Sequence, residues 1–539
     1  MEKFIINNFR LFDNSFEFET PPITILTGKN NSGKSSFIKA LLLFDDYISS
    51  SNQLFIDFTG NKLSKHKINS FDNAKNWDKG NSFSFTQNIN GLIECSYVFI
   101  KHDKTKARLK KFQLNVLNSR LSIKFEYTKS TEGDYKIIYT KDIIEYATLI
   151  DKIKFLESSI ELNEKKIQKT IADPTLEQKD GVKLTLEHTN LANNKRVKDI
   201  QLKKNELSNK KILLNELFKK NENKKFEFMV NSEQSKRHDS RKSLIDLIAS
   251  NILDDFASRT KTDVTVNKNQ IKNNQRENKK INTLPDYYFP FFSLFFEINN
   301  INIHHLSPNR TKQERLYIKN HENTEIETEI AKFVKTTHVT NFLQTWLEMF
   351  KIGDDINIRD IEGIASMVLI TEKNKIVNLV DLGFGAGQIL TILLKIANTI
   401  NEIKSERKAT STISRFKNRG TNLIIIEEPE SNLHPALQSY LAFLFIEVYK
   451  EYGIRFIIET HSEYFIRNLQ LLIAENHYSF QKDDTVIYYM SNTINENRIN
   501  KISINTDGSL TDKFGEGFLD EATKKSLKLM EIKNKNRKI

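Results

Sequence analysis

Three short apolar-rich runs stand out along the chain, and each is followed directly by polar residues. They are Ile23–Thr27, Asn422–Ile426 and Ile454–Ile458. Their nearly continuous apolar, β-branched character is typical of parallel strands that are buried on both faces. From Phe37 to Phe44, apolar residues recur at helical spacing. The pattern therefore predicts an α/β fold whose strands come from both ends of the chain.

The segment from about Thr148 to Lys220 is almost free of helix breakers, apart from Pro174 and Gly181. Apolar residues recur there at helical spacing in two stripes: Ile153, Leu156, Ile160 and Ile167 in the first, and Leu202, Leu207, Leu213, Leu214 and Leu217 in the second. This pattern favours an antiparallel helical hairpin, a short coiled coil with roughly 25–35 residues per arm. An ordinary helical subdomain packed on the core is the alternative.

Composition narrows the class of protein. The 539 residues suggest several structural units, and 81 Lys+Arg against 69 Asp+Glu give a net charge of +12. The single cysteine, Cys95, excludes a disulfide scaffold and a cysteine zinc site. The longest apolar runs fall far short of the roughly 18 residues that a membrane span needs. We expect a cytoplasmic protein without a membrane partner, and a basic charge that permits nucleic acid without establishing it.

The segment from Gly28 to Ser35 matches the pattern G-x-x-x-x-G-K-[ST] at every fixed position. A strand before this motif and a helix after it are the setting of a phosphate-binding P-loop, or Walker A motif. Lys34 is expected to reach the β- and γ-phosphates, and the Ser35 hydroxyl to ligate Mg²⁺. ATP is favoured over GTP. The expected nucleotide-binding residues are Gly28, Asn30, Asn31, Ser32, Gly33, Lys34, Ser35 and Ser36.

Two carboxylates follow the second apolar run. Glu427 and Glu428 are expected at the carboxyl end of a buried strand, which is where open α/β sheets bind ligands. Glu427 is predicted to hold Mg²⁺ through water, the Walker B role, and Glu428 to act as the general base that polarises the attacking water. The alternative is a strand that ends in solvated acids.

His461 comes shortly after the third run. A lone histidine at a strand end is usually structural. Here it follows the Walker B carboxylates by about thirty residues, where a switch histidine would contact the γ-phosphate. We therefore predict a catalytic role for His461 beside Glu428.

These motifs and their order resemble the ABC-type ATPases of the SMC/RecF/OLD group. Five segments carry the resemblance: Ile6–Asp13 as the first strand, His304–Arg310 as a Pro-x-Arg segment, Val380–Gln388 as the ABC signature, Glu427–Pro435 as extended Walker B and D-loop, and Thr506–Glu521 as a small closing domain. The resemblance implies a split ABC-type P-loop ATPase head with an inserted helical hairpin and a small C-terminal domain.

The resemblance also implies a homodimer or higher homo-oligomer. In this group ATP is sandwiched between the P-loop of one subunit and the signature of the other, so Gly385, Gly387 and Gln388 are expected to contact ATP in the opposite subunit. Gly387 departs from many relatives, which carry a serine there. Gln53 and Gln87 are both candidates for the Q-loop residue, and the sequence does not choose between them.

We divide the chain accordingly into five parts. They are an N-terminal lobe of the head (1–147), the helical hairpin (148–222), a mixed helical connecting region (223–300), a C-terminal lobe with signature, Walker B and switch histidine (301–475), and a small C-terminal domain with a basic tail (476–539).

Three runs are rich in Lys and Arg, and non-specific DNA or RNA is a candidate partner for them. Residues 193–225 carry 11 basic and 4 acidic residues, while residues 404–419 and 101–111 carry 6 basic and 1 acidic each. Such runs are equally typical of solvated faces, and the two interpretations stay open.

The preferred function is an ATP-driven dimeric switch that senses or clamps nucleic acid and controls a separate effector. The resemblance suggests the ATPase subunit of a prokaryotic antiphage system, Septu-like, with a nuclease or toxin as effector. Alternatives are a RecF-like DNA repair and recombination ATPase, a transporter ATPase subunit and an OLD-type ATPase-nuclease. Nuclease activity of this chain alone is disfavoured, because Asp483-Asp484 and Asp520-Glu521 are adjacent acids that would point to opposite faces of a strand.

Overall fold

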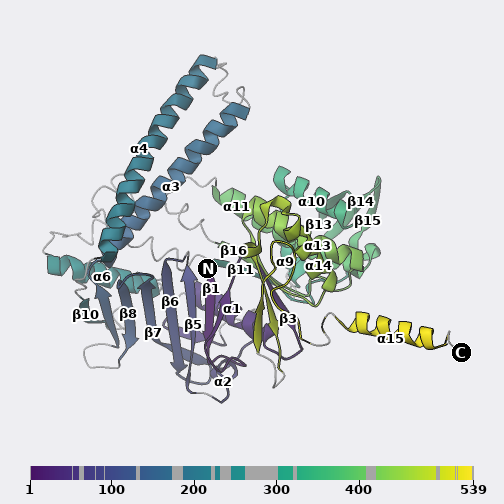
Figure 1. The fold of residues 1–539 in the computed structure, drawn as a ribbon, viewed down its shortest axis with the longest axis horizontal. Helices are drawn as coiled ribbons and strands as arrows, with labels where there is room; N and C mark the ends of the chain where they lie inside the picture. Colours follow the sequence, from purple (N-terminus) through teal and green to yellow (C-terminus); the bar gives the residue numbers. More distant parts are fainter. Residues whose placement is uncertain are drawn as a thin grey trace.

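The computed structural model describes residues 2–50, 52–59, 66–78, 80–89, 91–128, 134–172, 186–219, 225–230, 244–260, 301–319, 324–407, 421–492, 498–515, 518 and 520–536. Two sheets and a layer of helices form the body of the molecule, and a long helical hairpin projects from it (Figure 1).

A large antiparallel sheet forms one side of the body. Its order within the described residues is β10-β9-β8-β7-β6-β5-β1-β2, and β4 also pairs with β7. The strands are β1 Lys3–Asn7, β2 Phe16–Glu19, β4 Phe55–Asp57, β5 Ser82–Ile89, β6 Ile93–Lys101, β7 Lys106–Val116, β8 Ser122–Tyr127, β9 Tyr135–Thr140 and β10 Lys225–Val230. Alternate residues of β5 to β9 are buried, so one face of this sheet covers an apolar core.

A second sheet of six strands holds the motifs that the sequence singled out. Its order is β11-β16-β17-β3-β18-β19, with every pair parallel except β18 with β19. The strands are β3 Ile23–Gly28, β11 Ile301–Leu306, β16 Thr421–Glu427, β17 Arg455–Glu459, β18 Thr485–Met490 and β19 Ile499–Ile502. The α/β class predicted from the three apolar runs is confirmed.

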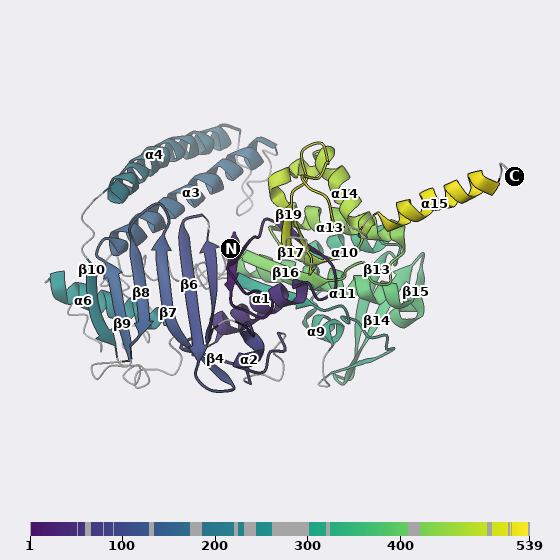
Figure 2. The same ribbon diagram turned by 60° about the horizontal axis from the view of Figure 1, so that its bottom comes forward.

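Burial on both faces explains why these strands are apolar throughout. In β16, Leu423 and Ile425 join the core shared with the large sheet, whereas Ile424 and Ile426 join a second core on the opposite face. The helix α1, Lys34–Ser49, belongs to the first core. Because the strands are parallel, the carboxyl ends of β3, β16 and β17 meet at one edge of the sheet. Figure 2 shows β16 and β17 beside each other, close to α1.

The second core is enclosed by helices and a small antiparallel sheet. The helices are α9 Glu325–Lys332, α10 Thr337–Met349, α11 Phe384–Arg407, α13 Pro435–Tyr452 and α14 Glu463–Ala474. The small sheet contains β12 Tyr317–Ile318, β13 Asp355–Ile361, β14 Ala365–Glu372 and β15 Lys375–Asn378. Lys395 of α11 forms a buried ion pair of 2.9 Å with Glu329, which ties α11 to α9.

The predicted hairpin is present. Helix α3 spans Ile143–Ala172 and α4 spans Leu186–Lys219, so the described arms are 30 and 34 residues long, within the predicted range. They pack against each other and extend away from the sheets (Figure 1). The turn at Pro174 and Gly181 lies outside the described residues.

One stripe of the hairpin was predicted correctly only in part, because Leu217 is buried and Leu207 and Leu214 are half-buried but two other leucines are not. Leu202 and Leu213 of α4 are 69% and 44% exposed, while Ile200 and Leu217 are buried. A helix turns by about 100° per residue, so Leu202 points almost opposite to Ile200. The apolar face of α4 is therefore set by Ile200 and Leu217 and does not include every leucine.

The structure departs from the expected domain division at two further places. Lys225–Val230 of the predicted mixed helical region forms β10, which pairs antiparallel with β9. Phe226, Phe228 and Val230 all pack on the core, and their spacing of two residues is the period of a strand. Thr485–Met490, placed by sequence in a separate C-terminal domain, forms β18, which lies between β3 and β19 in the six-stranded sheet and has all six residues buried.

The remaining described helices are α2 Phe71–Ala74, α6 Leu244–Thr260 and α15 Glu521–Asn536. None of the helices in the described part of the chain combines the length and apolar character that crossing a bilayer requires.

Candidate active site

The loop between β3 and α1 closely approaches the backbone of β18. A Cβ atom on Gly28 would lie 2.0 Å from the carbonyl oxygen of Met490, so no side chain fits at this position. Lys29 N donates to the same oxygen at 3.0 Å. Gly33 has φ of +123°, a conformation that favours glycine. These two glycines are required by the path of the loop.

The first turn of α1 is suited to an anion. The helix begins at Lys34 after Gly33, has no side-chain cap on its N-terminus and no acidic residue in its first turn. The N-terminal N–H groups and the helix dipole therefore favour a negatively charged ligand. Ser35 is exposed beside this turn, and Asn30 and Asn31 are exposed in the loop.

Lys34 is held inside the loop by backbone carbonyl groups. Its Nζ atom donates to the carbonyl oxygens of Gly28 at 3.1 Å and Lys29 at 3.0 Å. The Oε1 atom of Glu459 lies 3.9 Å away. Burial lowers the pKa of Lys34, and the negative charges of Glu459 and Glu428 oppose that shift.

Neighbouring P-loop serines are held by other residues. Ser32 Oγ donates to Lys29 O at 2.7 Å, and Ser36 Oγ accepts from Arg10 Nε at 3.3 Å. Arg10 lies in the loop after β1, and burial lowers its pKa. Ser36 is thus linked to the first strand as well as to the loop.

Glu427 and Glu428 lie where β16 ends, but their side chains have different partners. Glu427 Oε1 lies 2.6 Å from His305 Nε2, at the end of the adjacent strand β11. Glu428 Oε2 accepts from Ser431 Oγ at 2.9 Å. Glu428 has φ of +45°, which is unusual for a residue with a side chain, and its N–H donates to Glu459 O at 2.7 Å.

Glu459 and Glu430 complete a group of carboxyl groups at this edge. Burial raises the pKa of Glu459 to about 7, with a further contribution from the charge of Glu427. Burial also raises the pKa of Glu430, whose Oε1 accepts from His461 N at 2.7 Å. Because Glu427 and Glu459 are register partners on β16 and β17, the two acids are neighbours at the sheet edge.

His461 follows β17 directly and is exposed to solvent. Its ring lies near enough to two groups of the site to respond to their charges. Burial of part of the ring and the positive charge of Lys34 lower its pKa, and the charge of Glu428 opposes this. The structure therefore brings His461 to the same edge as Lys34 and Glu428.

The signature residues lie at the start of α11. They contact residues of the same chain that flank β11 and β16. A Cβ on Gly385 would meet Asn432 O at 2.6 Å, and one on Gly387 would meet Thr311 Oγ1 at 2.9 Å. Gln388 is buried, and its Nε2 donates to Pro308 O at 3.4 Å. Phe384, the first residue of the helix, is 41% exposed.

Both candidates for the Q-loop residue form side-chain contacts in other parts of the structure. Gln53 is buried, donates to Ile48 O at 2.5 Å and accepts from Leu244 N at 3.0 Å. Gln87 is buried in β5, where it interacts with Tyr97. Each of these glutamines therefore has a structural partner in the N-terminal half of the chain or in α6.

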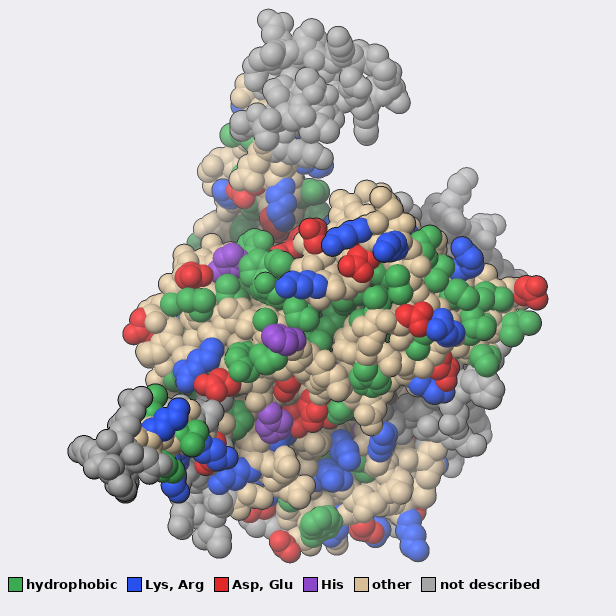
Figure 3. Space-filling model, turned by 90° about the vertical axis from the view of Figure 1, so that its right-hand side faces the viewer, with side chains coloured by type: hydrophobic (Ala, Val, Ile, Leu, Met, Phe, Trp, Pro, Cys, Tyr) green, Lys and Arg blue, Asp and Glu red, His purple; other side chains and the backbone are tan. Residues whose placement is uncertain are grey.

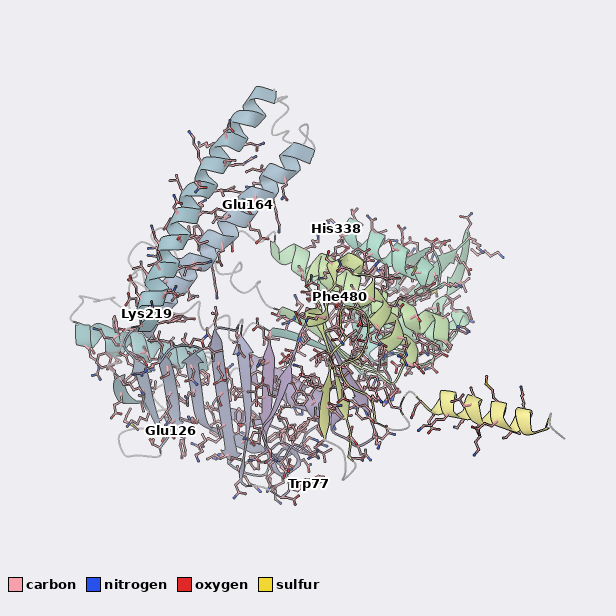
Figure 4. All side chains as sticks on the ribbon, in the orientation of Figure 1. Trp77, Glu126, Glu164, Lys219, His338 and Phe480 are labelled. Atoms are coloured by element: carbon pink, nitrogen blue, oxygen red, sulfur yellow. The ribbon has the colours of Figure 1, made fainter. Side chains whose placement is uncertain are left out.

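Much of the basic charge on the hairpin is paired with acids. Lys204 contacts Glu164 and Lys211 contacts Glu157 of the facing helix, both at 2.9 Å, and Lys203 pairs with Asp199 at 2.6 Å (Figure 4, where Glu164 is labelled). On the face of the body seen in Figure 3, basic and acidic side chains are interspersed. The run at 404–419 lies largely outside the described residues.

Several residues of this edge were not assigned a role from the sequence. Glu459 ends an apolar strand just as Glu427 does, and this position is the sequence feature that could have identified it as a site residue. His305 and Arg310 stood in a quoted segment, but their contacts to β16 join residues more than a hundred positions apart. Only the order of strands in the sheet brings them together.

The fold and this edge define the class of protein. The P-loop follows β3, and the two acids lie at the end of β16. The strand between β3 and β16 is β17, which ends in polar residues. This is the arrangement of a P-loop ATPase. The chain belongs to the AAA ATPase domain family, whose model matches residues 1–466. The expected resemblance is thereby confirmed at the level of an ATPase with a split head.

Similar chains occur among solved structures. One is an Smc head domain with an extended coiled coil, bound to the C-terminal domain of ScpA, from Pyrococcus furiosus; it is 11% identical over 99% of both chains, with a TM-score of 0.33. The SMC head domain from Thermotoga maritima is 9% identical over 91% of this chain and 95% of its own, with a TM-score of 0.30. No curated protein matches the chain significantly.

Proposed function

We propose that this chain binds and hydrolyses ATP with Mg²⁺ as a dimeric switch. The observation that carries the proposal is the meeting of Lys34, Glu427, Glu428 and His461 at one edge of the six-stranded sheet. Lys34 would neutralise phosphate charge, and Glu428 would accept a proton from the attacking water. His461 would contact the γ-phosphate.

The donor set at this edge fits Mg²⁺ bound together with a nucleotide. Mg²⁺ commonly takes one or two protein ligands and completes its shell with phosphate oxygens and water. The described residues contain no group of three or more His, Cys, Asp and Glu able to hold a metal. Ser35 would supply a hydroxyl ligand, Glu427 would hold the ion through water, and the ion would neutralise charge on the phosphates.

Dimerisation is proposed because the signature of a chain would complete the site of its partner. The exposed Phe384 marks the part of α11 that faces solvent. Gly385, Gly387 and Gln388, at the start of this helix, are proposed to contact the ATP that is bound to the P-loop of the opposite subunit. These residues pack against Asn432, Thr311 and Pro308 of their own chain. The partner's nucleotide would therefore be contacted by backbone N–H groups at the start of α11.

The proposed output of the switch is contact with nucleic acid and control of a separate effector, as in an antiphage ATPase subunit. The basic run on the hairpin supports the first part, and the resemblance to defence ATPases supports the second. ATP turnover by the purified chain, lost in Lys34→Ala, tests the enzymatic core. Co-purification of a nuclease or toxin encoded beside this chain tests the output, and its consistent absence from tagged preparations would contradict it.

A further inference from the structure

Arg310 is a guanidinium with no exposed surface, and its charge is directed at the backbone that carries the two Walker B acids. Nη1 donates to Glu427 O at 2.7 Å and to Ser307 O at 3.1 Å, and Nη2 donates to Glu428 O at 2.9 Å. Burial lowers the pKa of Arg310 to about 10, which leaves it charged at neutral pH.

The backbone that Arg310 holds is in an unfavourable conformation. Glu428 adopts a left-handed φ of +45°, which is unfavourable for a residue that is not glycine. Such a conformation persists only where surrounding contacts fix it. Arg310 fixes the carbonyl groups on both sides of the Glu428 N–H, which in turn donates to Glu459 O. The directions of both acid side chains depend on this turn.

The segment that carries Arg310 also contacts the signature helix. Gln388 Nε2 donates to Pro308 O, and Gly387 lies so close to Thr311 that a Cβ would approach Oγ1 to 2.9 Å. Gln388 and Thr311 are buried, and Gly387 leaves no room for a side chain beside Thr311, so a shift of the first turn of α11 is expected to move this segment.

We propose that residues 307–311 link the signature to the catalytic acids of the same chain, with Arg310 as the positioning residue. A signature that engages the nucleotide of the partner would thereby set the Glu427–Glu428 turn of its own site. The two composite sites of a dimer would be coupled through a short buried link. This inference rests on the proposed ATP hydrolysis and adds a regulatory path to it.

Arg310→Lys tests the positioning role. Lysine keeps the charge but cannot place a rigid fork of donors on two neighbouring carbonyls. We expect kcat to fall roughly tenfold to a hundredfold, while the dissociation constant for ATP measured by calorimetry changes less than about threefold. A loss of affinity in step with kcat, or an unchanged kcat, would overturn the inference.

A second pair of variants tests the link without disturbing the buried charge. Gly387→Ala is expected to lower kcat and retain ATP affinity, because its Cβ presses on Thr311. Adding Thr311→Ala removes the atoms that the Cβ would meet at 2.9 and 3.6 Å and leaves only a 3.8 Å contact, so kcat should recover. No recovery in the double variant would overturn the link.

The wild-type chain is measured alongside these variants. Turnover in the wild type with unchanged kcat in Arg310→Lys overturns this inference alone. No turnover in the wild type, at any protein concentration, overturns the proposed function and this inference with it.

Discussion

The Nζ atom of Lys34 lies 3.9 Å from the Oε1 atom of Glu459, and both side chains are almost fully buried. This contact joins the P-loop to β17, the strand that separates it from the Walker B strand. Glu459 therefore places a carboxyl group beside the P-loop lysine, where a nucleotide would place its phosphates. The proposed ATP site therefore includes this acid as well as the residues of the sequence motifs.

Lys34→Ala should abolish measurable ATP binding. The substitution removes the ammonium that would otherwise neutralise phosphate charge inside the loop. Calorimetric titration with ATP and Mg²⁺ measures the loss, with circular dichroism to confirm the fold. Lys335→Ala, which removes an exposed lysine paired with Asp355, is the matched control and should bind normally. Near-normal affinity in Lys34→Ala contradicts the P-loop assignment.

Glu428→Gln should bind ATP but hydrolyse it about 10²–10⁴-fold more slowly, because an amide cannot accept a proton from water. The amide still accepts from Ser431 through its oxygen, so the turn should keep its shape. Steady-state phosphate release gives the rate. The control is Glu463→Gln, an exposed acid on α14. If Glu428→Gln retains turnover and Glu427→Gln loses it with ATP binding spared, the roles of the two acids are reversed.

Glu459→Gln should change how stability depends on pH. The carboxyl has an ordinary pKa of 4.5 and a pKa of about 7 in the fold, so its favourable contribution is complete below 4.5 and is lost as pH rises through 7. Between about pH 5 and pH 8 the wild type should lose roughly 2–3 kcal/mol more stability than the variant. Denaturant unfolding measures this difference, and parallel pH curves would show that Glu459 titrates normally.

The sequence was sufficient for the motifs that are local in the chain and insufficient for those that depend on tertiary contact. Gly28, Gly33 and Lys34 follow from a short loop motif between a strand and a helix, and the two long helices of the hairpin follow from helical spacing. Arg310 could not be assigned a role, because its partners at Glu427 and Glu428 become neighbours only when β11 pairs with β16.

The domain boundaries also depend on the order of strands in the sheets, which the sequence alone does not reveal. β18 was placed in a separate C-terminal domain because sequence separation hides its pairing with β3. The second leucine stripe of the hairpin was wrong at Leu202 and Leu213 for a different reason. Leucines on a charged helix occupy both faces, and only packing against α3 selects Ile200 and Leu217 as the buried ones.

The hairpin provides a test of nucleic-acid binding. If Lys204 and Lys211 bind phosphates, reversing both to Glu should reduce the slope of log affinity against log salt by about 0.9 for each phosphate that is no longer neutralised. Their ion pairs with Glu164 and Glu157 are exposed, so stability should change by only about 1 kcal/mol per pair. Fluorescence anisotropy with DNA of unrelated sequences gives the slope.

The control for that experiment reverses two exposed lysines of the other lobe, Lys319 and Lys335, with the same change in net charge. Equal slopes in the wild type and the hairpin variant, with the control also unchanged, would show that the hairpin does not bind phosphates. Loss of a co-purifying protein in the hairpin variant would instead identify the arm as a protein-docking element.

The design of a subunit-mixing experiment follows from the contacts of the signature. Gly385 is unsuitable for substitution, because a Cβ would strike Asn432 O of the same chain at 2.6 Å. Phe384→Glu is better suited, because the residue is exposed and an acid in the first turn of a helix is favourable. The new charge would repel the phosphates of the partner's nucleotide, and Phe384→Gln is the neutral control.

ATP turnover by mixtures of Lys34→Ala and Phe384→Glu subunits tests the central claim most directly. Each variant alone should be inactive, while a mixed dimer joins the intact P-loop of one subunit to the intact signature of the other. Equimolar mixtures should recover at most about a quarter of the wild-type rate, because half of the dimers are mixed and each has one intact site. The coupling through residues 307–311 lowers this recovery further, because the intact site takes its acids from the subunit with the altered signature. Inactivity at every mixing ratio, or full activity of Phe384→Glu alone, would contradict an ATP site shared between two subunits.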